Sequence, residues 1–185
     1  MVYQLRIDLI GAKPPIWRRI LIDASGSLYD LHCAIQGAFG WYNGHLHGFY
    51  KGRTFFGIPD DEFTSHEAVD EQKTLIANVL GYEGDVLDYE YDFGDGWEHR
   101  IKLEKILAEA PTKTLPVCIK GKNACPPEDI GGLWGYYDFL EIINDPEHPE
   151  YAETAEWIGR DSYDPTWFDM KEANEMMAEG CIELW

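Results

Sequence analysis

Alternation of apolar and polar residues is strongest in residues 87–107. Apolar or aromatic side chains occupy every second position up to Phe93 and again from Trp97, and a Gly-Asp-Gly turn separates the two runs. This period of two predicts a β-hairpin with one buried face. A three-residue loop keeps the aromatic positions on a common face, so we predict that Phe93 pairs with Trp97 and Tyr91 with His99.

Four further strands are predicted before the hairpin, two on each side of a helix. They cover residues 3–10, 16–22, 47–50 and 53–57. The helix begins at Ser27, because Asp30 three residues later completes a weak capping box, and it ends at Gly40. Its apolar stripe is expected to lie across the sheet. The acidic segment Ile58–Glu71 is expected to form a surface loop.

Beyond the hairpin, one more strand at 115–119 and a Pro- and Gly-rich loop precede three predicted helices. The helices cover residues 133–144, 150–158 and 169–178. We therefore predict a single α+β domain over residues 1–185. A curved, mostly antiparallel sheet wraps the central helix in a β-grasp-like order over residues 1–122, and residues 123–185 form a loop and a helical C-terminal part.

The composition of the chain indicates which partners and which cellular compartment to expect. The chain has 15 basic and 34 acidic residues and a net charge of −19, which repels phosphate backbones and makes nucleic acid an unexpected partner. No apolar run approaches the roughly 20 residues of a membrane helix, and the N-terminus shows no signal-peptide pattern. Four scattered cysteines favour free thiols and a cytoplasmic protein over a disulfide framework. They are Cys33, Cys118, Cys125 and Cys181.

Five short strings follow one another along the chain. They are PPIWRRI at 14–20, HLHGF at 45–49, YDFGDGWEH at 91–99, CPPEDIGG at 125–132 and GYYDFL at 135–140. Together they resemble the plasmid pRiA4b ORF-3-like family, from about Tyr3 to about Met177. The resemblance implies no established activity. Some relatives are labelled resolvases or repressors, which implies a DNA transaction that the charge opposes. Relatives often carry a cysteine where this sequence has Ile130.

Histidines and carboxylates in these strings form a candidate metal site. His45 and His47 are two residues apart, so on a strand both imidazoles face the same way. Asp92 and His99 add ligands of the types that zinc and other transition metals take. The predicted hairpin register opposes this set, because it places His99 on the aromatic face and Asp92 on the other. Asp95 is expected to be a turn residue.

Other polar groups have structural explanations. Glu128 and Asp129 lie between two prolines and two glycines, where they suit acid–base chemistry. Asp129 equally suits a cap for the turn or for the helix that begins near Leu133. Cys118 and Cys125 are too far apart in sequence for the tight pairs of structural zinc sites, so two free thiols are expected.

Two functions remain open from the sequence. The first is a cytoplasmic, non-catalytic binding or interaction module, in which a cleft near HLHGF, FGDGW and CPPEDIGG receives a protein, peptide or small molecule. The second is a hydrolase-like, metal-dependent enzyme that uses His45 and His47 with carboxylates and a divalent metal such as zinc or another transition metal. The candidate binding residues are Trp17, Trp41, His45, His47, Asp95, Trp97, Glu128, Asp129 and Trp134, and the candidate metal ligands are His45, His47, Asp92 and His99.

Overall fold

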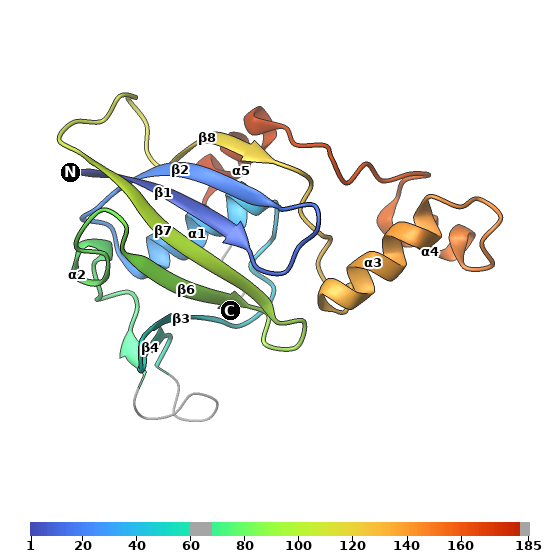
Figure 1. The fold of residues 1–185 in the computed structure, drawn as a ribbon, viewed down its shortest axis with the longest axis horizontal. Helices are drawn as coiled ribbons and strands as arrows, with labels where there is room; N and C mark the ends of the chain where they lie inside the picture. Colours follow the sequence, from blue (N-terminus) through green and yellow to red (C-terminus); the bar gives the residue numbers. More distant parts are fainter. Residues whose placement is uncertain (60–67, 182–185) are drawn as a thin grey trace.

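The computed structural model describes residues 1–59 and 68–181, which form one mixed sheet and five helices (Figure 1). The strands are β1 (Val2–Leu9), β2 (Trp17–Asp23), β3 (His47–Lys51), β4 (Thr54–Gly57), β5 (Val69–Asp70), β6 (Val86–Tyr91), β7 (Trp97–Leu107) and β8 (Val117–Lys122). The helices are α1 (Leu28–Phe39), α2 (Ile76–Val79), α3 (Gly132–Ile143), α4 (Tyr151–Ile158) and α5 (Met170–Glu179).

The strands lie in the order β5-β4-β3-β6-β7-β1-β2-β8. Every neighbouring pair is antiparallel except β4 and β5. The curved sheet carries α1 across one face (Figure 1). Between them lies the core, in which Leu5, Ile7 and Ile20 of the sheet and Leu31 and Ile35 of α1 are fully buried. The predicted α+β class, with a mostly antiparallel sheet on a central helix, is confirmed.

The ends of α1 follow the sequence signals closely. The Ser27 hydroxyl accepts a hydrogen bond from the Asp30 N–H at 3.1 Å, and the Asp30 carboxylate accepts one from the Ser27 N–H at 2.7 Å. Gly40 ends the helix with φ of 86°, a left-handed conformation that glycine adopts without a steric penalty. Both ends of the predicted helix are therefore confirmed.

The β6–β7 hairpin has the predicted faces but a different register. Tyr91 pairs with Trp97 and Tyr89 with His99, so the pairing is shifted by two residues from the prediction. The turn is longer because Asp92 leaves the strand with φ of 55°. Phe93, expected in the core, is consequently 42% exposed. A shift of two residues preserves the alternation, which is why the buried face is nevertheless correct.

The C-terminal helices divide into two groups. In Figure 1, α3 and α4 lie beyond one end of the sheet, whereas α5 returns alongside α1. The two helices approach so closely at Gly37 that a Cβ there would lie 2.6 Å from the Met177 nitrogen. A disulfide between Cys33 and Cys181 ties α1 to the segment after α5. The expectation of free thiols at these two cysteines is therefore wrong.

The acidic segment before α2 is only partly the surface loop that was predicted. Residues 60–67, which carry several of its acids, lie outside the described residues. Val69–Asp70 forms β5, and Glu71 is fully buried against His47 rather than exposed. The pattern of apolar and polar residues along the chain did not indicate that the Glu71 carboxyl would be buried. Among the described residues, every helix is too short or too polar to cross a bilayer.

Candidate metal centre

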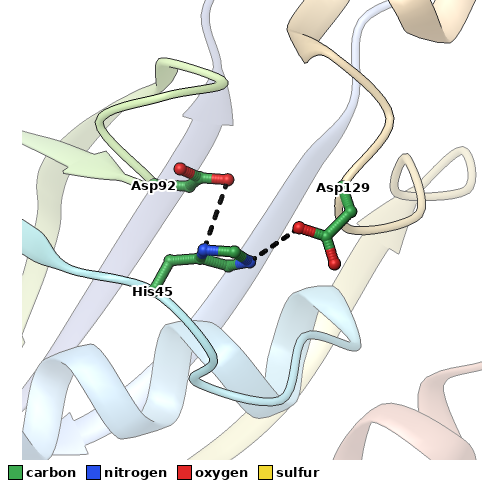
Figure 2. A group of neighbouring side chains, drawn as sticks. All are labelled: His45, Asp92 and Asp129. Carbon is green, nitrogen blue, oxygen red and sulfur yellow. Dashed lines mark ion pairs between the residues drawn. The ribbon is translucent and has the colours of Figure 1, made fainter.

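Three loops bring one imidazole and two carboxylates together (Figure 2). His45 lies just before β3, Asp92 directly after β6, and Asp129 in the loop that precedes α3. His45 Nε2 is 3.0 Å from an Asp129 carboxylate oxygen, and His45 Nδ1 is 3.7 Å from an Asp92 oxygen. One ligand atom from each residue lies within 4.8 Å of the others.

The two aspartates share an unusual backbone conformation. Asp92 has φ of 55° and Asp129 has φ of 58°, in the left-handed region that non-glycine residues seldom adopt. Aspartate tolerates it because its short carboxylate bonds to nearby backbone, and one Asp92 oxygen accepts the Gly94 N–H at 2.9 Å. The other Asp92 oxygen faces His45. Such conformations concentrate at functional sites, where the surrounding structure maintains them.

Contacts between the loops hold the cluster in place. Asp92 N–H donates to the Leu46 carbonyl at 2.8 Å, which joins the His45 segment to the turn. The Asp95 carboxylate accepts the Gly131 N–H at 3.1 Å, which joins the turn to the Asp129 loop. Asp95 was expected to be a turn residue. It lies in the turn and also anchors a second loop, a role that its sequence position did not indicate.

A tyrosine and a glutamate border the cluster. The Tyr91 ring lies edge-on to the His45 ring, with centroids 5.9 Å apart. The Tyr91 hydroxyl donates to Glu128 and accepts the Gly44 N–H at 3.0 Å. Glu128 also accepts the Tyr42 N–H at 3.1 Å. Burial and the neighbouring Glu128 carboxylate raise the pKa of Tyr91 well above its usual value, so the phenol stays protonated.

Two of the four predicted metal ligands lie elsewhere. His47 is buried, with Nε2 2.9 and 3.1 Å from the Glu71 oxygens, and its ring stacks on His32 at 3.4 Å. His99 is buried beside Phe39, and its Nδ1–H donates to a backbone carbonyl at 2.9 Å. Burial lowers the pKa of each of these two imidazoles to about 3.

The predicted set separates for a simple geometric reason. Strand alternation applies only within a strand, and β3 begins at His47, so His45 precedes the strand and points another way. Asp129, which was expected to bind a ligand or to cap a turn or helix, joins His45 and Asp92 in the cluster instead. The residue before α3 is Gly131, and it provides no side-chain cap.

The chemistry of the cluster fits a divalent cation. Two carboxylates face the two nitrogens of one imidazole, at 3.7 Å from Nδ1 and 3.0 Å from Nε2, and a cation would offset their negative charge. One imidazole with two carboxylates suits zinc and other transition metals. The ligand atoms of tetrahedral zinc lie about 3.3 Å apart at bond lengths near 2.0–2.1 Å. The three ligand atoms here lie within 4.8 Å of one another, and the two carboxylates face different nitrogens of His45. The Asp129 side chain, which is 70% exposed, would therefore have to turn toward Nδ1 to share an ion with Asp92.

The remaining candidates do not meet at this cluster. Trp41 and Trp97 are buried in the core, Trp17 lies half-buried beneath the Arg6 guanidinium, and Trp134 is 86% exposed. Among the described residues, neither free cysteine belongs to a group of metal-ligating side chains. Burial raises the pKa of both thiols, Cys118 and Cys125, which keeps them protonated and poor metal ligands. The expectation of two free thiols at these positions agrees with the structure.

The fold and the site together define an α+β domain whose loops gather polar side chains at one end of an open sheet. The chain belongs to the plasmid pRiA4b ORF-3-like protein family, whose model matches residues 1–172. It is 36% identical over 174 residues to the uncharacterized protein y4hQ of Sinorhizobium fredii, covering 94% of this chain and 89% of that protein.

A solved structure shares both the fold and the sequence similarity. It is the crystal structure of a protein of unknown function, MM3350, from Methanosarcina mazei Go1. The TM-score is 0.82 and the identity 39%, over 92% of this chain and 96% of that chain. The predicted family and the α+β fold are thus confirmed. No function is established among these relatives.

Proposed function

We propose that this protein binds one divalent transition-metal ion, zinc in the first instance, at His45, Asp92 and Asp129, and that the ion presents open coordination positions to a ligand between the three loops. The observation that carries the proposal is the convergence of these side chains from three segments, two of them with left-handed backbone at the ligand residue. Three protein ligands with a remaining open position are typical of zinc that interacts with substrate or water.

The surroundings support an ion that is held and remains accessible. Asp92 is nearly buried, with a side chain 12% exposed, whereas Asp129 faces solvent. The inner carboxylate therefore fixes the position of the ion, and the outer one allows entry and exchange. The pairing of Asp95 with Gly131 holds the outer loop against the turn.

Hydrolysis at the bound ion is the second candidate function. It is favoured by the Tyr91–Glu128 pair, which lies against His45 and contains a carboxylate able to accept a proton from a metal-bound water. The binding role is the primary proposal because metal coordination requires only the convergence of the three ligands.

The test is metal analysis of untagged protein, followed by calorimetric titration of the metal-free protein with zinc. We expect one ion per chain and at least about a tenfold loss of affinity in His45→Gln, the loss typical of removing a ligand or its support. His148→Gln is the matched control, because His148 lies outside the cluster. Absence of a stoichiometric ion together with equal zinc affinity in the two variants would reject the proposal.

A further inference from the structure

A cavity of about 410 Å³ lies between the end of α1, the loop before α3 and the segment that joins α4 to α5. Its volume falls within the range of about 300–1,000 Å³ typical of small-molecule sites. Aromatic side chains from the C-terminal part form much of the wall, namely Trp157, Tyr163, Trp167 and Phe168. A single arginine from the sheet, Arg18 of β2, also lines the cavity.

Arg18 is only 2% exposed. Its Nε donates to the Ala38 carbonyl at 2.9 Å, and its Nη1 donates to the carbonyls of Trp17 and Lys122 at 2.9 and 3.1 Å. Within the part of the chain that the structure describes, Nη2 makes no hydrogen bond and no carboxylate lies within 4.0 Å of the guanidinium. Buried arginines are almost always paired with an anion, so this exception needs an explanation.

Aromatic contacts orient the guanidinium without neutralising it. The Arg18 guanidinium carbon lies 4.0 Å from the centre of the Phe168 ring and 5.0 Å from that of Phe39. These rings stabilise a cation through their π faces, but they provide no acceptor for the two remaining N–H groups. Burial lowers the pKa of Arg18, yet an arginine remains charged at neutral pH. A permanent positive charge with two free donors therefore lines an aromatic cavity.

We propose that this cavity binds a small organic monocarboxylate with an aromatic or apolar body, its carboxylate on Arg18 Nη2 and its body against the tryptophans. The two N–H groups of Nη2 can donate charge-assisted hydrogen bonds to a carboxylate, whose negative charge complements the positive charge of the guanidinium. The acids Glu128, Asp169 and Glu172 also line the cavity, as does Arg160. Three carboxylates thus outnumber two guanidiniums, which disfavours a dianion such as a phosphate monoester. Arg18 contacts none of the three metal ligands, so its proposed role does not depend on the metal, although Glu128 lines this cavity and also borders the metal cluster.

The test compares acids with their neutral amides on the wild-type protein, so it does not depend on a variant that folds. Phenylacetate, 3-phenylpropionate and indole-3-acetate are titrated against the corresponding amides and followed by backbone and indole N–H shifts in NMR spectra. EDTA is present throughout, so that a metal ion cannot bind the carboxylates. We expect at least one acid to bind about tenfold or more tightly than its amide, as one charge-assisted contact provides.

Two variants locate the binding. Trp167→Ala removes a 61% exposed wall residue and should weaken the acid at least about threefold, whereas Trp134→Ala, outside the cavity, should leave it unchanged. Arg18→Gln, provided that its circular dichroism matches wild type, should abolish the preference for the acid. The proposal is overturned if no acid binds more tightly than its amide, if phenyl phosphate binds more tightly than every acid, or if the two tryptophan variants behave alike.

Discussion

Replacing Glu71 by glutamine should remove a specific pH dependence from the stability of this protein. Glu71 is fully buried, and its two oxygens lie 2.9 and 3.1 Å from His47 Nε2. Such distances fit an ion pair as well as a neutral pair. Burial decides for the neutral pair, because it raises the pKa of Glu71 to about 8, with Asp70 adding to the rise, and lowers that of His47 to about 3.

The size of the effect follows from proton linkage. Unfolded Glu71 has a pKa near 4.5 and the folded residue one near 8, so the folded chain binds one extra proton between these values. Stability from this group is therefore present at low pH and is lost as the pH rises through 8. Between about pH 6.5 and pH 8 the expected loss is about 1.6 kcal/mol. Glu71→Gln does not titrate, and its amide N–H can still donate to His47.

The assay is urea unfolding of wild type and Glu71→Gln at several pH values across this window. The stability of the variant relative to wild type should rise by about 1.6 kcal/mol from pH 6.5 to pH 8. Glu109→Gln, at an exposed position, should show a constant difference. If the Glu71→Gln difference is also constant, then the folded pair holds no extra proton in this window, Glu71 is ionised beside a neutral His47, and the reasoning from burial is refuted.

Three further outcomes test other parts of the structure. Denatured without reductant, the chain should show two reactive thiols rather than four, and four would contradict the Cys33–Cys181 pairing. Because this disulfide closes a separation of 148 residues, its reduction should lower the free energy of unfolding by up to about 5 kcal/mol. Gly132→Ala should lower the free energy of unfolding, measured by chemical denaturation, by about 1–3 kcal/mol. The reason is that Gly132 has φ of 68° and a Cβ there would lie 2.4 Å from the Asp95 carbonyl oxygen. Gly81→Ala, with open space around it, should leave the stability unchanged. Zinc at about a hundred times its Kd should stabilise the chain by about 2.7 kcal/mol and raise its Tm, and EDTA should remove the rise.

The sequence predicted faces and ends of elements better than it predicted pairings. Alternation in the hairpin placed Tyr91, Trp97 and His99 correctly on the buried side, because alternation determines a face. It does not determine the length of a turn, and the left-handed Asp92 lengthened this one. The end of a helix was predictable where the capping residues are close together in the sequence, as Ser27 and Asp30 are.

The candidate site was predictable in location and only partly in composition. The cleft was expected where the HLHGF, FGDGW and CPPEDIGG segments meet, and the structure brings these segments together at His45, Asp92 and Asp129. Selecting among the histidines required the start of β3, which periodicity locates only to within a few residues. Arg18 was missed, although alternation with Ile16, Ile20 and Ile22 along the strand places it, and not Arg19, on the buried face.

The three proposed metal ligands belong to segments that meet only after β3 has joined β6 and the loop before α3 has reached the hairpin turn. A partly assembled chain would therefore have no high-affinity position for the ion. During refolding, the chain would then bind the metal only in the last step. A truncated chain that lacks the C-terminal third, and with it Asp129, would lose its response to zinc even where its sheet still forms.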